Sequence, residues 1–268
     1  MRDALYQVYW DAVNTLPILF TYSSLALPFL PRPDPQDDFY PVSPEYALEA
    51  GNYSRVPVIA GDQQDEGTLF AQVQYNITEN GTLAEYMHMI YPGASQPDIE
   101  ALLAVYPEDP AAGSPFGTGT TNTLWSQSKK MASLLGDVAF TLRRRSYLSH
   151  VSTTLPAWSL LDSNRFQESV LGTYHSSDIE AIFNTTSIMP TTRNTVATQT
   201  YLTHYIFFVN YQDPNAISID APLLYWPQYS TWNPVLLNLL NTGNALIQDD
   251  FRQEASNFLE STVSQFRL

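Results

Sequence analysis

The stretch VPVIAGDQQDEGTLF, residues 56–70, decides the fold that we expect for this chain. It begins with a short apolar run, residues 56–59, which favours a strand buried on both faces of a parallel sheet. The run stops at Gly61, and the acids Asp62, Asp65 and Glu66 follow it. A carboxylate just past the carboxyl end of a buried strand lies where open α/β sheets place their chemistry. We therefore predict an α/β fold with a candidate acid at this strand end.

A second apolar run, PAWSLL at residues 156–161, predicts another buried strand. A polar connection leads from it to GTYHSSDI, residues 172–179, which contains His175. If the two strands are parallel neighbours, the side chains that follow them emerge at the same edge of the sheet. Glu66 could then accept a hydrogen bond from one ring nitrogen of His175, which leaves the other nitrogen free to accept a proton.

Both residues also have simpler interpretations. A glutamate before Gly67 at a helix start is a favourable charge near the positive end of the helix. A single histidine in a polar loop is commonly solvated. His88, His150 and His204 fall in helical segments, and we interpret them as structural or surface residues.

At 268 residues the chain is long enough to bury a core as one domain or two, and an apolar run predicts a further strand at residues 235–240. The expected helices cover residues 4–13, 43–51, 81–91, 96–106, 124–151, 178–183, 194–210 and 249–259. Residues 109–121 are rich in Gly, Pro and Thr and predict a loop. The three consecutive arginines, residues 143–145, fan around a helix and predict a solvated face. Asp178 is expected either to bond within the His175 loop or to cap a helix.

Composition excludes several classes of protein. The chain has 268 residues, of which 44% are hydrophobic, and its 12 Lys and Arg against 27 Asp and Glu give a net charge of −15. This charge disfavours binding to nucleic acid or to an anionic membrane surface. No apolar run is long enough to form a transmembrane segment, because prolines and polar residues interrupt residues 16–30. No cysteine, zinc motif or calcium-loop spacing is present, so no metal or cofactor is expected.

The D-E-G-T step at Glu66 resembles the acid loop of the type-B carboxylesterase/lipase family, in the branch of fungal secreted lipases and cholinesterases. The segments at residues 29–51, 106–119 and 172–179 resemble further family segments, so that the resemblance covers most of the chain from about residue 16. It implies that residues 1–268 form the carboxy-terminal portion of one α/β-hydrolase domain, a partial fold with a mostly parallel sheet. Glu66 and His175 would be the acid and the histidine of its Ser-Glu-His triad. The substrate class that it implies is a carboxylic ester or a lipid.

The family's nucleophile motif, G-E-S-x-G, is absent, and no G-x-S-x-G occurs anywhere in the chain. The family order is serine, then acid, then histidine, so the serine is expected before Met1. The oxyanion loop belongs to the same amino-terminal half. We therefore expect the carboxy-terminal portion of a longer protein, inactive alone and dependent on the missing half to complete its core.

Two observations bear on the cellular compartment. Asn52, Asn76, Asn80 and Asn184 each begin a glycosylation sequon, which favours a secreted glycoprotein. Residues 1–15 lack the apolar core of a signal peptide. An extracellular parent whose signal lies in the missing portion reconciles the two.

Two other functions compete with ester hydrolysis. The chain could be a non-catalytic binding relative, like the adhesion proteins of the cholinesterase branch. The presence of both Glu66 and His175 disfavours this, because a protein that only binds has no need for them. An unrelated aromatic-rich binding module is the third hypothesis.

Overall fold

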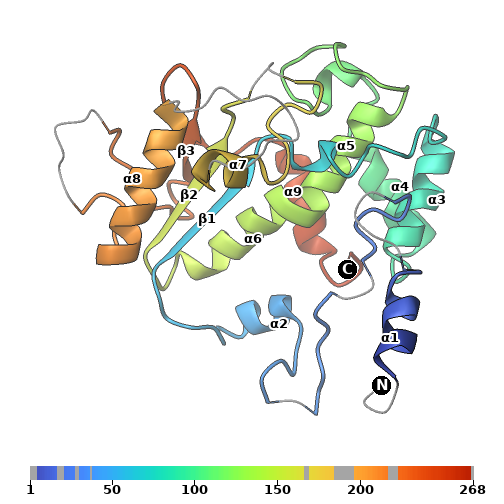
Figure 1. Cartoon of the computed structure of the whole chain (residues 1–268), viewed down its shortest axis with the longest axis horizontal. Helices are drawn as coiled ribbons and strands as arrows, with labels where there is room; N and C mark the ends of the chain where they lie inside the picture. Colours follow the sequence, from blue (N-terminus) through green and yellow to red (C-terminus); the bar gives the residue numbers. More distant parts are fainter. Residues whose placement is uncertain are drawn as a thin grey trace.

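The computed structural model describes residues 5–16, 21–27, 30–36, 38–165, 169–183, 196–216 and 223–266. Within these residues four strands form one sheet in the order β1 (Val58–Gln63), β2 (Ala157–Asp162), β3 (Val235–Leu239) and β4 (Ala245–Gln248). The first three strands are parallel neighbours (Figure 1). Strand β4 pairs antiparallel with β3. Helices pack on this mixed sheet, which confirms the α/β class predicted from the sequence.

The central strand β2 is buried along its whole length because helices cover both of its faces. Ala157 and Leu161 pack in one apolar cluster with residues of α6 (Leu142–Val151). The alternate residues Trp158 and Leu160 pack in another cluster with residues of α8 (Val196–Tyr211). Successive side chains of a strand point to opposite faces, so the apolar run at residues 156–161 is the sequence of a strand between two helical layers.

The strand β1 differs from the prediction in two ways. The apolar run predicted a strand at residues 56–59, whereas β1 starts at Val58 and ends at Gln63. The strand continues past Gly61 because its residues pair with β2 as far as Gln63 and Asp162. Its first three residues are only half-buried and Gly61 is exposed, so the expectation of burial on both faces is wrong. Among the described strands β1 pairs with β2 alone, and an edge strand has one uncovered side.

The largest apolar cluster lies beside the sheet, among α3 (Asn80–Ile90), α4 (Gln96–Ala104), α5 (Ser128–Gly136) and α9 (Gln253–Ser261) (Figure 1). Every one of these helices buries at least two apolar side chains, including Met87, Leu102, Leu134 and Leu259. This cluster fixes α5 in place, and α5 in turn supports the turn that follows β1.

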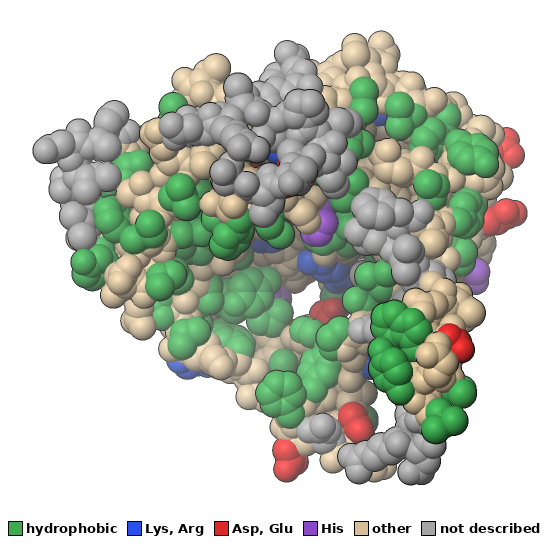
Figure 2. Space-filling view, viewed as in Figure 1, with side chains coloured by type: hydrophobic (Ala, Val, Ile, Leu, Met, Phe, Trp, Pro, Cys, Tyr) green, Lys and Arg blue, Asp and Glu red, His purple; other side chains and the backbone are tan. Residues whose placement is uncertain are grey.

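Two amino-terminal helices agree with their predicted positions. Helix α2 (Pro44–Glu49) starts after Ser43 and is followed by Gly51, whose φ of 66° favours glycine. Helix α1 (Tyr6–Val13) forms, but it buries none of its residues. Its apolar side chains lie on the surface together with other apolar groups, as the space-filling view shows at its lower right (Figure 2).

The helix expected over residues 124–151 is interrupted. Helix α5 begins at Ser128, a π-helical turn follows at Asp137–Thr141, and α6 then continues to Val151. The loop predicted at residues 109–121 contains one short 3₁₀ turn, Pro110–Ala112. Strand β4 was not predicted, and α9 begins at Gln253 rather than at Asp249. Helix α7 (Ser177–Phe183) lies where it was expected.

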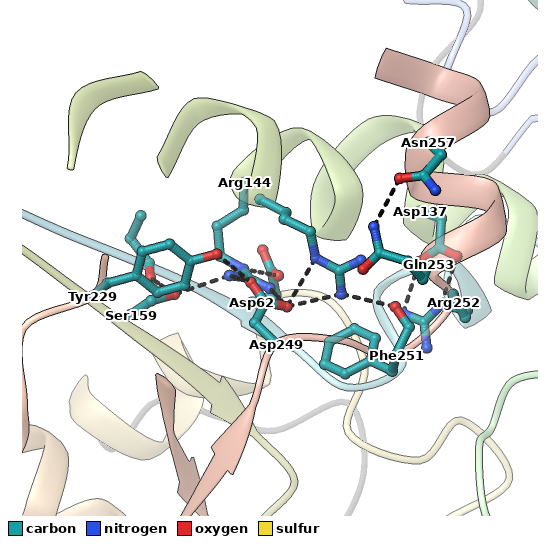
Figure 3. A network of polar contacts seen from close by, with 12 residues as sticks. Asp62, Asp137, Arg144, Ser159, Tyr229, Asp249, Phe251, Arg252, Gln253 and Asn257 are labelled. Atoms are coloured by element: carbon teal, nitrogen blue, oxygen red, sulfur yellow. Dashed lines mark hydrogen bonds and ion pairs between the residues drawn. The ribbon is translucent and has the colours of Figure 1, made fainter. Parts of the chain in front are cut away.

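The arginine run is not a solvated face, and that prediction is wrong. Arg144 and Arg145 are both buried, and each donates to the carboxylate of Asp249, which follows β4 (Figure 3). Arg144 also donates to Asp62 at the end of β1 through its Nε, at 2.5 Å. The charges are therefore paired inside the fold, where they connect α6 to β1 and to the segment after β4.

Candidate functional site

Glu66 opens a 3₁₀ turn, Glu66–Thr68, three residues after β1 ends. Its side chain folds back so that Oε1 accepts the backbone N–H of Gln63 at 2.8 Å. The side chain is buried, with 7% of its surface exposed. This hydrogen bond to the strand end fixes the carboxylate in one orientation, with Oε2 available to a second partner.

That second partner is His175, whose Nδ1 lies 2.6 Å from Oε2 of Glu66. A carboxylate accepts hydrogen bonds, so the contact fits the tautomer in which Nδ1 donates its proton to Glu66. The imidazole packs against the rings of Phe70 and Phe140, with centroid distances of 5.2 and 4.8 Å. Nε2 has no hydrogen-bond partner among the described residues, and 32% of the side chain is exposed.

The two loops that carry this pair are joined by further hydrogen bonds. The N–H of Asp65 donates to the carbonyl of Thr173 at 2.9 Å. Thr68 Oγ1 donates to the carbonyl of Leu171 at 2.7 Å. On the far side of His175, Ser177 Oγ lies 3.1 Å from Oε1 of Gln63. The contact between acid and imidazole is thus one of several between the segments that follow β1 and β2.

A groove of about 630 Å³ runs along β1 to the imidazole. Its lining includes Gly61 of the strand, Glu66, His175, Asp178 and Phe140 from the π-helical turn. Figure 2 shows that this face of the molecule is hollowed near its centre. An imidazole that is oriented by a buried carboxylate and open to a groove can accept a proton from a hydroxyl group and return it.

Two acids beside the pair have perturbed titration. Burial raises the pKa of Asp65 to about 6, against the opposing effect of hydrogen bonds from Phe116, Ser114 and Thr173. Burial also raises the pKa of Asp178, and the nearby charge of Glu66 acts in the same direction. Asp65 and Asp178 therefore both lie in surroundings that disfavour their charged forms.

The other acids and histidines singled out in the sequence form no hydrogen bond with the pair among the described residues. Asp62 lines the same groove, but its carboxylate accepts from Arg144. His88 is exposed, His150 is half-buried on α6, and buried His204 bonds to the carbonyl of Pro214. No group of three or more His, Asp or Glu side chains could hold a metal ion within the described part of the chain. The structure places Asp178 on the groove and leaves its predicted bonding or capping role untested.

The structure describes three of the four predicted glycosylation sites. Asn52, Asn76 and Asn80 lie on the surface, and Asn184 is outside the described residues. The Asn80 amide donates to Glu108 at 2.6 Å and accepts from Lys130, while Asn76 donates to the hydroxyl of Tyr22. Glycosylation at these positions stays a prediction. Over the same described residues, no helix has the length and apolarity that a membrane crossing requires.

Sequence reasoning missed the residues that support the pair. Phe140 reaches the imidazole from a π-helical turn, and the apolar spacing did not distinguish that turn from a continuous helix. Asp65 was noted only as one of the acids that follow the first apolar run, although it bonds to both neighbouring loops. Its position next to Glu66 was the one available signal.

The sequence comparisons agree with this geometry. The family model described as the carboxylesterase family matches residues 2–259. The chain is 38% identical over 272 residues to secreted lipase 1 of Botryotinia fuckeliana, covering 100% of this chain and 46% of that protein. It is 35% identical to a secreted triacylglycerol lipase of Gibberella zeae, covering 98% of this chain and 44% of that one. The chain therefore spans less than half the length of these relatives.

A solved structure gives the same result for the fold. Aspergillus niger EstA superposes with a TM-score of 0.69 at 20% identity, over 90% of this chain and 46% of that protein. This similarity, together with the four-stranded mixed sheet, confirms the expectation of a partial α/β-hydrolase fold.

Proposed function

This chain belongs to the carboxylesterase family, and we propose that it supplies the acid, Glu66, and the base, His175, of a Ser-Glu-His triad that hydrolyses carboxylic or lipid esters. The observation that carries the proposal is the 2.6 Å contact between His175 Nδ1 and Glu66 Oε2, which joins the segments that follow two parallel strands. The names of the relatives, secreted lipases, support the ester substrate and an extracellular protein.

In the proposed mechanism Glu66 keeps the proton of His175 on Nδ1, so that Nε2 faces the groove as a base. Nε2 removes the proton of an attacking serine hydroxyl, the serine oxygen bonds to the ester carbonyl carbon, and a tetrahedral oxyanion forms. His175 then gives its proton to the leaving alkoxide, which leaves an acyl-enzyme. Water deprotonated by the same nitrogen cleaves the acyl-enzyme and restores the starting state.

We propose that the serine and the oxyanion-binding N–H groups lie in a segment outside this sequence. Two observations support this: the chain contains no G-x-S-x-G, and the groove runs along the unpaired side of β1. The exposed apolar residues of α1 also favour a covering segment. This chain alone should not hydrolyse esters at a measurable rate.

The test uses a fluorophosphonate probe, which labels activated serines, together with hydrolysis of a p-nitrophenyl ester. The 268-residue chain should show neither labelling nor turnover. The same chain joined behind the part of the Botryotinia fuckeliana lipase that it does not cover should show both.

In that joined protein E66Q should lower kcat by roughly 10⁴-fold, the loss typical of a triad acid changed to its amide. H175A should lower kcat by roughly 10⁶-fold. H88A, at an exposed histidine of α3, should leave the rate unchanged. Stoichiometric serine labelling of the chain alone, or an active joined protein that is indifferent to E66Q and H175A, would refute the proposal.

A further inference from the structure

Asp65 precedes the proposed catalytic acid and is 1% exposed, yet the proposed mechanism gives it no role. We propose that Asp65 is a positioning residue, whose carboxylate holds the His175 loop in register with the Glu66 turn. The inference rests on the proposed function, because it concerns the orientation of the same acid and imidazole.

Asp65 connects the turn that carries Glu66 to the loop that carries His175. Its own N–H donates to the carbonyl of Thr173, and its Oδ2 accepts the N–H of Thr173 at 3.0 Å. Residue 65 therefore bonds to both polar backbone atoms of a residue two positions before His175. Since Glu66 is the next residue in the chain, any shift between the two loops has to break this reciprocal pair.

The other carboxylate oxygen brings in a third segment. Oδ1 accepts the hydroxyl of Ser114 and the N–H of Phe116, both at 2.8 Å. Lys129 in turn fixes this segment, because its ammonium donates to the carbonyl of Pro115 at 3.0 Å. Ser114 and Phe116 thus fix the carboxylate through Oδ1, while Oδ2 accepts the N–H of Thr173.

Local geometry leaves no room for another arrangement. Gly172 has a φ of 62°, and a Cβ at that position would lie 2.1 Å from Oδ2 of Asp65. The backbone before His175 therefore passes directly over the carboxylate, at a distance that only glycine permits. Beyond His175, Ser177 bonds to Gln63, so that the imidazole lies between two tethered positions.

Three donors meet this carboxylate, and the side-chain amide of the D65N variant cannot satisfy all of them. That amide would keep one acceptor oxygen and would direct its NH₂ group at Thr173 or at Ser114 and Phe116, where donors already point. Burying a carboxylate is costly, and no ion pair to Asp65 lies within the described residues. Its three hydrogen bonds, together with the more distant charge of Arg252, offset that cost. A buried acid serving only stability would affect the melting temperature without affecting the imidazole.

The test is NMR of the whole chain labelled with ¹⁵N-histidine. The downfield Nδ1–H signal of His175 reports its hydrogen bond to Glu66, and E66Q assigns the signal by removing it. In D65N the exchange of this proton with water should be faster by about tenfold or more, the factor that corresponds to one net hydrogen bond. D162N is the matched control, because Asp162 is also buried and accepts several hydrogen bonds but does not contact Thr173. In D162N the exchange rate of the His175 proton should stay within about twofold of wild type, because substitutions at sites without shared partners act independently.

The outcomes separate the two proposals. A wild-type chain without the Nδ1–H signal contradicts the pairing of Glu66 with His175 and hence the proposed function. A wild-type signal that persists with unchanged exchange in folded D65N overturns the role of Asp65 alone. If D65N does not fold, S114A decides in its place: it removes one donor to Oδ1 and should accelerate exchange, and an unchanged rate overturns the inference.

Discussion

Gly67 packs against the carbonyl group of Ala132 so closely that a Cβ at residue 67 would lie 1.9 Å from that oxygen. Gly67 is the second residue of the turn that begins with Glu66, and Ala132 belongs to α5. The absence of a side chain thus lets the turn that carries Glu66 rest directly on a helix backbone.

The variant G67A should therefore lower the free energy of unfolding by about 3 kcal/mol, since the clash involves backbone that cannot rotate away. Denaturant unfolding checks this. Gly81 of α3 is the control, because no atom lies within 4 Å of a Cβ there. G81A should be neutral or stabilising by up to about 1 kcal/mol, and an equal loss in both variants would contradict the close-approach argument.

The buried ion pair between Arg144 and Asp249 should be costly to break. Arg144 Nη1 lies 2.8 Å from Oδ2 of Asp249, and the two side chains are 4% and 0% exposed. R144M leaves two buried carboxylates, Asp249 and Asp62, without their shared partner. The free energy of unfolding should fall by about 3–5 kcal/mol.

A double variant tests whether the loss comes from the uncompensated charge. R144M/D249N should cost less than the sum of the two single variants, with a coupling of about 1–3 kcal/mol. R32Q, at an exposed arginine, should change stability by at most about 0.5 kcal/mol. If the losses in the free energy of unfolding of R144M and D249N simply add in the double variant, the two charges do not interact, and each side chain contributes to stability through packing alone.

The pairing of Glu66 with His175 could be expected from sequence because each follows an apolar run typical of a buried strand. The fate of Arg144 could not, because its partner Asp249 lies 105 residues away and α9 had been placed over that acid. Helical spacing also gave no sign of the π-helical turn at Asp137–Thr141, because Leu135, Val138 and Leu142 are spaced as in a regular helix. The half-burial of β1 depends on what pairs with it, and a strand's own residues do not encode that.

Lys129 should contribute more to stability than its neighbour Lys130. Its ammonium is buried and donates to Thr118 Oγ1 at 2.7 Å and to the carbonyl of Gly119 at 2.8 Å, as well as to Pro115. K129M would remove these three hydrogen bonds and leave the carbonyl of buried Pro115 without its donor, at a cost of about 1–3 kcal/mol. Hydrogen exchange of residues 114–121 should accelerate, because the loop loses its central donor.

Lys130 provides the matched control on the same helix. It is also buried, but its partner Glu108 has 58% of its side chain exposed and can be solvated when the lysine is removed. K130M should cost at most about 1 kcal/mol and leave exchange in residues 114–121 unchanged. Equal losses in the two variants would show that the bonds to the loop carbonyls add nothing beyond burial of the aliphatic chain.

Asp162 should make the stability of the protein depend on pH. Burial raises its pKa from 3.8 to about 7, even though Asn164 and Tyr201 donate to it. An acid whose pKa is higher in the folded state binds protons more tightly there. Its contribution to stability is therefore complete below its unfolded pKa and is lost as the pH rises through about 7.

D162N removes this titration and leaves the other buried acids in place. The melting temperature of wild type minus that of D162N should therefore be larger at about pH 5 than at about pH 8, with the change falling between the usual pKa of 3.8 and the raised pKa of about 7. E85Q, at an exposed acid of α3, is the control and should shift the melting temperature equally at both values. A difference between wild type and D162N that grows with pH would mean that the hydrogen bonds from Asn164 and Tyr201 outweigh burial and stabilise the charged form.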